Sequence, residues 1–215
     1  MFELKGVVIT GPEIIILGGG GHASVLEDAL QANGLTLLGY VAPEPSEMLA
    51  VPYLGDDLWL ATQDRAKLSL VNGLGTIGVD GLRASSFQKF TELGFKFAVV
   101  KHGHSSVSTS STLMDGAQIL AGAVIGPHSH IGRDVIVNVS ASVCHHCQIG
   151  DNVHIAPGAV LCGSVTVKPG AFIGAGATVI QGVTVGAGSL VAAGAMVVRD
   201  LPDGIRVSGV PARPR

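Results

Sequence analysis

Residues 137–163 read VNVSASVCHHCQIGDNVHIAPGAVLCG, and an aliphatic side chain recurs in this stretch at every sixth position. The same phase continues outward in both directions, without an insertion, from residue 107 to residue 197. The sixteen members of this aliphatic column are Val107, Leu113, Ile119, Ile125, Ile131, Val137, Val143, Ile149, Ile155, Leu161, Val167, Ile173, Val179, Val185, Val191 and Val197. A period of six is not a helix period, and it is typical of a hexapeptide β-solenoid.

A second column, two positions before each aliphatic residue, contains only small or β-branched residues, such as Ala117, Ala141, Cys147 and Ala159. In a hexapeptide solenoid each repeat forms one short strand and a turn, and three repeats complete a triangular coil. Only small side chains fit beside the inward aliphatic ones, because three faces converge on a narrow axis. Sixteen repeats therefore predict a little over five coils.

The period also predicts which residues stack. Residues eighteen apart lie on the same face of successive coils, separated by about 4.8 Å as in neighbouring strands. We therefore expect His145 to stack on Gly163, His128 on His146, and Cys144 on Cys162. A base and a backbone N–H on adjacent coils form an arrangement suited to acyl transfer, because one group takes a proton while the other stabilises an oxyanion.

Five glycines directly follow members of the aliphatic column. They are Gly126, Gly132, Gly150, Gly174 and Gly186. Turns favour residues that tolerate a positive φ, so we expect such backbone conformations at these five positions.

The first hundred residues predict a small α/β unit. Residues 14–17 are expected to form a buried strand, 24–33 a helix and 35–41 a second strand. Further expected elements are a strand at 67–75, a helix at 83–93 and a strand at 95–100.

The intervening glycine turn fits the dinucleotide fingerprint Gly18-x-Gly20-x-x-Ala23, in which bare backbone and a helix N-terminus accept a phosphate. The acidic residue of that fingerprint is missing at the end of the second strand, where Val41, Ala42 and Pro43 stand. A complete NAD domain also needs a longer chain. We therefore interpret this unit as a nucleotide-facing domain without redox chemistry.

Composition excludes several classes of protein. The 215 residues carry 13 Lys+Arg and 16 Asp+Glu, a formal net charge of −3, without a basic run for nucleic acid. With 13% charged and 47% hydrophobic residues, the chain does not resemble a disordered one. No apolar run approaches the roughly 18 residues of a membrane span, and the N-terminal MFELKG lacks the order of a secretory signal. We expect a cytoplasmic protein.

Three stretches together resemble the sialic acid O-acetyltransferase/nucleotide-sugar N-acetyltransferase family of hexapeptide-repeat acyltransferases. They are GGGGHA (18–23), residues 137–163, and SGVPARP (208–214). The resemblance covers nearly the whole chain. It implies a Rossmann-like nucleotide-sugar-binding domain at 1–101, followed at 102–215 by a left-handed parallel β-helix acetyltransferase domain with a C-terminal tail. It also implies acetyl-CoA as cosubstrate, no metal, and a homotrimer with active sites between subunits.

The resemblance further implies roles for single residues. The family motif N-x-x-x-x-x-x-H-[ED]-C is matched by Asn138, His145 and Cys147, so His145 is the expected general base. Gly163, one coil further, is expected to bind the acetyl carbonyl through its N–H. The other implied residues are His154, Ala175, Ala193 and Arg213 for acetyl-CoA, and Gly20, Gly21, His22 and Gly75 for the nucleotide-sugar.

Two positions depart from the family pattern. His146 stands where the family has an acidic residue that orients the base, and Ala42-Pro43 replaces an acidic pair after the second strand. A second imidazole can accept a hydrogen bond from the base but brings no negative charge. An amine acceptor tolerates this change better than a hydroxyl, because part of the amine is already neutral near pH 7. The substitution therefore favours N-acetylation.

The expected activity is acetylation of the amino group of a nucleotide-linked 4-amino-4,6-dideoxy sugar. The alternatives are O-acetylation of sialic acid or a related sugar, and a non-catalytic β-solenoid scaffold. Five histidines between residues 128 and 154 raise a further alternative, the three-imidazole zinc site of hexapeptide carbonic anhydrases. Cys144-x-x-Cys147 resembles half a zinc or redox motif, although Cys147 lies in the small column and is expected to fill the core.

Overall fold

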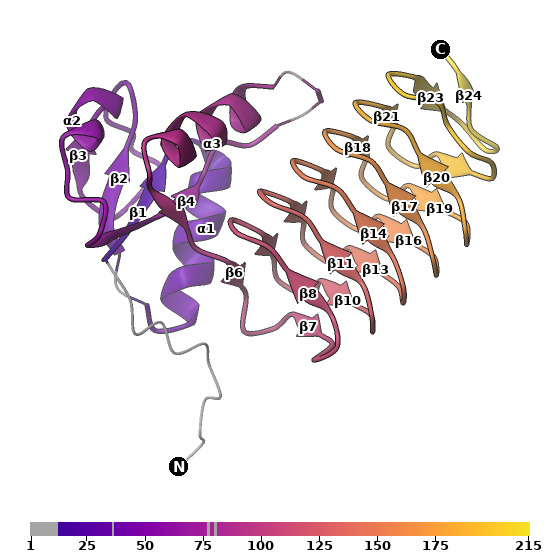
Figure 1. Cartoon of the computed structure of the whole chain (residues 1–215), viewed down its shortest axis with the longest axis horizontal. Coiled ribbons are helices and arrows are strands. Elements are labelled where there is room, and N and C mark those ends of the chain that lie inside the picture. Colours follow the sequence, from indigo (N-terminus) through magenta and orange to yellow (C-terminus); the bar gives the residue numbers. More distant parts are fainter. Residues whose placement is uncertain (1–12, 36, 77, 80) are drawn as a thin grey trace.

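The period of six produces a three-sided β-solenoid over the C-terminal half of the chain (Figure 1). The structure is a computed structural model, and it describes residues 13–215 except 36, 77 and 80. The N-terminal MFELKG, considered above as a leader, lies outside the described residues. The predicted register is confirmed, because Val143 pairs with Leu161 and Ile155 with Ile173, each eighteen residues further on.

The solenoid strands form three parallel sheets, here called faces 1, 2 and 3 in the order in which the chain visits them after β6. Face 1 contains β7 (Ser106–Val107), β10 (Val124–Ile125), β13 (Ser142–Val143), β16 (Val160–Leu161), β19 (Thr178–Val179) and β22 (Met196–Val197). Face 2 contains β8 (Thr112–Leu113), β11 (His130–Ile131), β14 (Gln148–Ile149), β17 (Thr166–Val167) and β20 (Thr184–Val185). Face 3 contains β6 (Val100–Lys101), β9 (Gln118–Ile119), β12 (Ile136–Val137), β15 (His154–Ile155), β18 (Phe172–Ile173), β21 (Leu190–Val191), β23 (Arg206–Ser208) and the antiparallel β24 (Arg213–Pro214).

The two sequence columns build the core of the solenoid. The aliphatic residues from Ile119 onward and the small residues beside them, Cys147 included, are buried in one continuous cluster. The positive φ angles, however, fall three residues after the aliphatic column, as at His146 (φ 58°) and Asn152 (φ 56°). The expectation of positive φ at Gly126 and its four counterparts was wrong. A Cβ on Gly126 would lie 2.7 Å from the His145 nitrogen, so these positions need glycine because the backbone of the next coil is too close.

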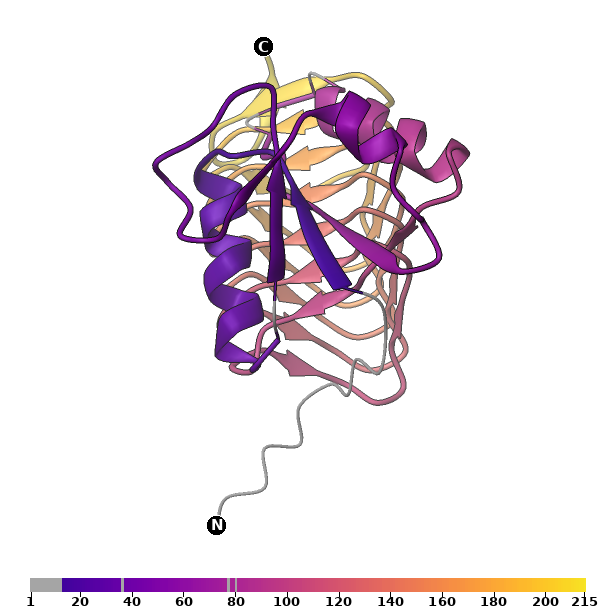
Figure 2. The ribbon, with the colours of Figure 1, turned by 90° about the vertical axis from the view of Figure 1, so that its left-hand side faces the viewer.

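The N-terminal unit is a parallel sheet with helices packed on it (Figure 2). The sheet has the order β3-β2-β1-β4-β5. Its strands are β1 (Glu13–Leu17), β2 (Leu37–Val41), β3 (Tyr53–Gly55), β4 (Leu68–Asn72) and β5 (Lys96–Phe97), and the helices are α1 (Gly21–Ala32), α2 (Asp57–Ala61) and α3 (Leu82–Glu92).

Several predicted bounds of this unit need correction. Helix α1 begins at Gly21, not at residue 24, and Gly20 is its N-cap. Of the four glycines of this turn, only Gly18 has a positive φ, so the other glycines do not interrupt the start of the helix. The predicted strand 67–75 ends at Asn72, and the predicted strand 95–100 divides into β5 and β6. Strand β3 and helix α2 were not predicted, although Asp56 signals the start of α2 by accepting bonds from two N–H groups.

The N-terminal unit packs against face 3. Leu26 and Leu30 of α1 share one buried cluster with Val100, Leu120 and Ile136 of the solenoid. Strand β6 already pairs with β9, so the solenoid sheet begins at Val100, two residues before the predicted domain boundary. None of the helices in the described part of the chain is long and apolar enough to cross a membrane.

Candidate active site

His145 and Gly163 occupy the same place on successive coils, at the edge where face 1 turns into face 2. The His145 carbonyl accepts a hydrogen bond from the Ser164 nitrogen at 2.8 Å, which fixes the two turns together. A Cβ added to Gly163 would lie 2.5 Å from Nε2 of His145, so the imidazole lies against the bare Cα. Among the hydrogen bonds of the described residues, none has the Gly163 N–H as donor. The predicted stacking of His145 on Gly163 is therefore present.

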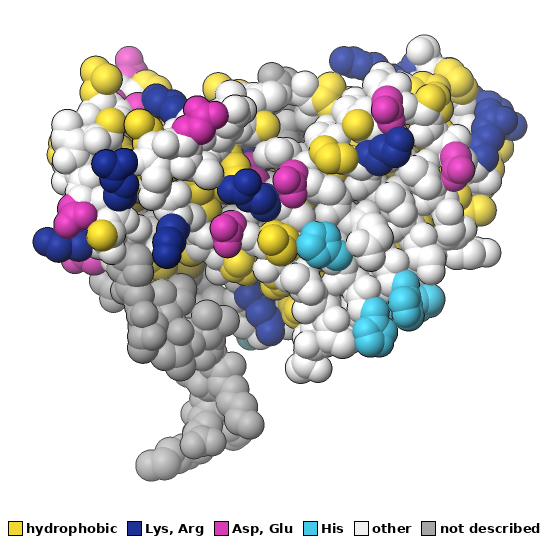
Figure 3. Space-filling view, in the orientation of Figure 1, with side chains coloured by type: hydrophobic (Ala, Val, Ile, Leu, Met, Phe, Trp, Pro, Cys, Tyr) yellow, Lys and Arg dark blue, Asp and Glu magenta, His cyan; other side chains and the backbone are white. Residues whose placement is uncertain are grey.

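His146 binds the other nitrogen of the His145 ring. The two Nδ1 atoms are 3.1 Å apart, so one ring donates the hydrogen and the other accepts it. When His145 donates, its Nε2 carries the free lone pair on the side of Gly163. The ring of His128, one coil earlier, lies 5.1 Å from that of His146, as the period predicted. All three imidazoles are exposed, and histidine side chains gather on one side of the solenoid in Figure 3.

A second group of predicted residues surrounds a cavity between α1 and the solenoid. This cavity, of about 400 Å³, is lined by Gly21, His22, Val25, Gly75, Thr76, Asn138 and His154. It thus brings together three of the residues predicted for the nucleotide-sugar with two predicted for transfer. Gly20, the exposed N-cap of α1, directly precedes this lining.

Both histidines of this cavity are held in one tautomer. Nδ1 of His154 donates to the Thr76 carbonyl at 3.1 Å, so its Nε2 accepts from Asn138 Nδ2 at 3.1 Å. Burial, followed by the charges of His22 and Arg83, lowers the pKa of His154 to about 4. Burial and the Arg83 charge likewise lower the pKa of His22 to about 4, against a hydrogen bond to Gln118 that raises it. Both rings are neutral at pH 7.

The two groups lie on different edges of one protomer. Asn138 follows β12 at the edge between faces 3 and 1, whereas His145 follows β13 at the edge between faces 1 and 2. Ala175 and Ala193 are exposed on the Asn138 edge, and the Gly194 nitrogen bonds the Ala175 carbonyl at 2.9 Å. A whole strand of face 1 therefore separates Asn138 from the expected base.

Arg213 lies at the far end of the solenoid. It is exposed on β24, which pairs with β23 at the C-terminal end of face 3. Basic side chains gather at this end of the molecule in Figure 3, and Arg199, Arg206 and Arg215 are exposed there as well.

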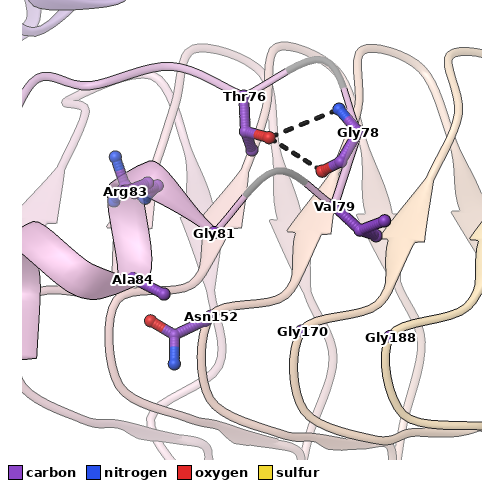
Figure 4. A pocket seen from close by; sticks show the side chains of 9 residues that line it. All are labelled: Thr76, Gly78, Val79, Gly81, Arg83, Ala84, Asn152, Gly170 and Gly188. Carbon is purple, nitrogen blue, oxygen red and sulfur yellow. Dashed lines mark hydrogen bonds between the residues drawn. The ribbon is translucent and has the colours of Figure 1, made fainter.

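A further cavity, of about 230 Å³, lies between the loop after Thr76, the start of α3 and the edge between faces 2 and 3 (Figure 4). Beside it, Arg83 donates to Asp134 at 2.7 Å, with both side chains buried. Burial raises the pKa of the Asp134 carboxyl, and the adjacent Arg83 guanidinium opposes this shift. This ion pair joins the N-terminal unit to the solenoid.

No metal-binding cluster is found in the part of the chain that the structure describes: no three or more His, Cys, Asp or Glu side chains are arranged to hold an ion. Cys144, Cys147 and Cys162 are free, and Cys147 is buried as expected of a core residue. Burial raises the pKa of the Cys147 thiol to about 11. This environment is unsuited to a reactive thiolate.

The chain is similar in sequence and in fold to known proteins. Residues 128–163 match the family model described as bacterial transferase hexapeptide (six repeats). The structure of a variant of GDP-perosamine N-acetyltransferase from Caulobacter crescentus, in complex with CoA and GDP-perosamine, is 40% identical over 94% of this chain and 96% of that chain, with a TM-score of 0.88. The chain belongs to the nucleotide-sugar N-acetyltransferase family.

Another similar structure is that of the acetyltransferase domain of PglB from Neisseria gonorrhoeae, in complex with acetyl coenzyme A. It is 31% identical over 95% of this chain and 100% of that chain, with a TM-score of 0.90. WeeI from Acinetobacter baumannii, at 21% identity over 94% of this chain and 99% of that chain and a TM-score of 0.76, shares the fold. No curated protein sequence matches the chain.

Sequence reasoning missed several buried residues beside the candidate site. Gln118, Asn72 and Arg83 are buried at the boundary between the two units, and Thr76 lines the cavity. One signal was available for Gln118. It is a polar residue at an outward strand position of face 3, where Ile136, Phe172 and Leu190 are apolar.

Proposed function

We propose that this protein transfers the acetyl group of acetyl-CoA to the amino group of a nucleotide-linked 4-amino-4,6-dideoxy sugar. The observation that carries the proposal is the imidazole of His145 lying against the bare Cα of Gly163, whose N–H finds no acceptor among the described residues. The relatives named above, which bind CoA, acetyl-CoA and GDP-perosamine, support the same reaction. The domain at residues 1–101 binds the nucleotide-sugar together with Asn138 and His154 of the solenoid, and the domain at 102–215 carries out the transfer.

In the chemical step the neutral sugar amine attacks the thioester carbonyl. Nε2 of His145 accepts the proton that the nitrogen loses, and the Gly163 N–H donates to the oxyanion that forms on the carbonyl oxygen. The carbon–sulfur bond then breaks, the departing CoA sulfur takes the proton from the imidazolium, and the products are the amide and free CoA thiol. A single oxyanion donor is worth about 3–4 kcal/mol in comparable enzymes.

His146 orients the base. With Nδ1 of His146 as acceptor, Nδ1 of His145 carries the hydrogen and Nε2 is free to take the proton from the amine. The ring thus performs the orienting part of a carboxylate's role without its charge. This arrangement suits an amine, which loses its proton more readily during attack than a hydroxyl does.

The cavity beside α1 receives the nucleotide-sugar. No side chain caps the first turn of α1, and no acidic residue lies in it, so its N–H groups and helix dipole are available to a pyrophosphate. The space beside Gly20 and Gly21 is open, since a Cβ at either position would meet no atom within 4 Å, so a phosphate has room to approach the backbone there. The sugar then lies toward His22, Gly75 and Asn138.

A homotrimer completes the site. The base and the nucleotide-sugar cavity lie at the two edges of face 1, so one copy offers the base to the cavity of the next. Face 1 is suited to an interface: its outward Val124 and Met196 are exposed, and the remaining outward residues are small or aliphatic. A ring of copies closes such a heterologous contact. We place the enzyme in the cytoplasm with its acetyl-CoA, supplying surface polysaccharide or glycan synthesis.

An assay of free thiol release tests the activity. The protein is incubated with acetyl-CoA and a panel of nucleotide-linked 4-amino sugars, with sialic acid and hydroxyl sugars as competing acceptors. We expect turnover with an amino sugar and a loss of about 10²–10⁴-fold in kcat for His145→Ala, with His130→Ala on face 2 as the control. Turnover of hydroxyl acceptors alone would establish the O-acetyltransferase, and absence of CoA binding would establish a scaffold.

Subunit mixing tests the shared site. Sedimentation should give a trimer, and a mixture of inactive His145→Ala and Asn138→Ala chains should regain activity, because some interfaces then combine two intact halves. Failure of the mixture to exceed either variant, although the chains exchange, would place the whole site within one chain.

A further inference from the structure

A chain of buried hydrogen bonds crosses the boundary between the two units and ends at His22. Nε2 of His22 lies 2.7 Å from Oε1 of Gln118, on strand β9 of the solenoid. Nε2 of Gln118 donates to the Asn72 carbonyl at 2.8 Å, and Nδ2 of Asn72 donates to the Asp134 carboxyl at 3.2 Å. The side chains of Gln118, Asn72 and Asp134 are fully buried.

Each amide in this chain has only one possible orientation. The Asn72 carbonyl can only accept, so the group of Gln118 that faces it is the NH₂, and Oε1 of Gln118 faces His22. The same holds at Asn72, whose Oδ1 accepts from the Leu74 nitrogen at 3.3 Å while its NH₂ faces the carboxyl of Asp134. An amide oxygen is acceptor-only, so Nε2 of His22 must carry the hydrogen.

This tautomer leaves Nδ1 of His22 with a free lone pair. Among the hydrogen bonds of the described residues, none reaches that atom. The Nε2 end of the ring is the buried end, against a fully buried glutamine, and the ring lines the cavity of about 400 Å³. A group that meets Nδ1 from the cavity must donate a hydrogen, because a phosphate oxygen would face a lone pair.

We propose that Gln118 is a positioning residue that fixes His22 as the Nε2–H tautomer, so that Nδ1 accepts a hydrogen bond from a hydroxyl or amine hydrogen of the nucleotide-linked sugar. This inference rests on the proposed function and adds the substrate group that His22 recognises. It assigns the sugar to His22 and leaves the phosphates to the first turn of α1. The ring is neutral at pH 7, since burial lowers its pKa to about 4, so it recognises a donor without adding charge.

The unmodified protein provides the first test. Nitrogen-15 NMR of the His22 ring distinguishes a protonated Nε2 from a protonated Nδ1. We expect Nε2–H in the free protein, and a shift of the Nδ1 resonance when the nucleotide-sugar is added but not when the nucleoside diphosphate alone is added. A protonated Nδ1, or a shift caused equally by the diphosphate, would overturn the inference.

Two variants then connect the tautomer to substrate binding. Gln118→Met removes both hydrogen bonds, so His22 exchanges between tautomers, and KM for the nucleotide-sugar should rise by about three- to tenfold with kcat little changed. The ionised side chain of Gln118→Glu offers only acceptors and favours protonation of His22, so KM of this variant should rise more steeply as the pH falls. The matched control is Asn33→Ala, which removes another bond between the units, to the Lys101 carbonyl at 2.8 Å, away from His22.

The outcomes separate this inference from the proposed function. The positioning role would be contradicted if KM of Gln118→Met were no higher than KM of Asn33→Ala and if the His22 ring of Gln118→Met still gave the Nε2–H signal of the unmodified protein. If the unmodified protein acetylates no nucleotide-linked amino sugar, the proposed function fails, while the tautomer of His22 is still decided by the ring signals. If Gln118→Met does not fold, the NMR of the unmodified protein and the pH dependence of KM for Gln118→Glu still test the inference.

Discussion

The bare Cα of Gly163 lies against the imidazole of His145, one coil earlier in the solenoid. A side chain at position 163 would therefore displace the ring before it disturbed the backbone, since a Cβ there would lie 2.5 Å from Nε2. The position needs glycine because of the ring and not because of its φ, which lies outside the positive region.

Gly163→Ala should reduce kcat by about 10²-fold, because displacing a catalytic group by about 1 Å costs that much. The thermal midpoint should change little, since the ring that must move is exposed. Thiol release and thermal unfolding measure the two effects. The control is Gln181→Ala, one coil further in the same column, which should retain wild-type kcat. If Gly163→Ala is fully active, neither the Gly163 amide nor the His145 ring takes part in catalysis.

Two replacements of His146 test whether its hydrogen bond to His145 matters for the reaction. His146→Ala removes the partner of His145 Nδ1, and kcat should fall about tenfold, the worth of one orienting hydrogen bond. His146→Asp supplies a carboxylate acceptor and tolerates the φ of 58° at this position, so it should recover most of the loss. Steady-state kinetics at saturating acetyl-CoA provide the measurement. Equal losses in both variants would show that His146 does not act as an acceptor.

The neutral state of His154 has a measurable effect on stability. Its pKa is lowered to about 4 in the folded protein and is about 6.5 when unfolded, so the unfolded chain binds the extra proton between these values. Stability should therefore rise with pH across this window and be lost as the pH falls from 6.5 to 4. In His154→Gln that component is absent. The difference in unfolding free energy between the two proteins should favour the wild type increasingly from pH 4 to 6.5, and a flat difference would contradict the assignment.

The Arg83–Asp134 pair should be sensitive to removal of a single partner. Arg83→Met leaves a buried carboxylate without its cation and should destabilise the protein by about 3–5 kcal/mol. The double variant Arg83→Met/Asp134→Asn removes the charge as well and should recover part of that loss, because asparagine also tolerates the φ of 53° at residue 134. Denaturant unfolding of the two single variants and the double variant measures the coupling. Additive losses would mean that the pair does not act as a unit.

The solenoid could be predicted from the sequence because its repeat is local and uninterrupted. Each strand has two residues, of which one points inward. The aliphatic residue at every sixth position therefore predicts both the strand register and the burial of Val143 and Leu161. The stacks of His145 on Gly163 and of His128 on His146 follow from the same count. The role of Gly126 did not follow, because a close approach to the next coil cannot be distinguished from a turn conformation in the sequence.

The cavity side of the site depended on contacts that no local pattern encodes. Thr76 and His22 come from loops of the N-terminal unit, and they reach His154 and Gln118 only because that unit packs on face 3. This packing rests on long-range apolar burial and one buried ion pair, in which the partners are 51 residues apart. The motif GGGGHA indicated His22 but not the residue that orients it.

The uninterrupted eighteen-residue register restricts how the length of this protein can change. Adding or deleting a complete coil would keep every later side chain on its former face or edge and would only move the C-terminal arginines along the axis. Adding a single hexapeptide before Asn138 would keep the core filled but rotate His145 and Gly163 onto another edge, where the trimer that we propose could not use them. Natural length variants that remain active are therefore expected to differ by multiples of eighteen residues in this segment.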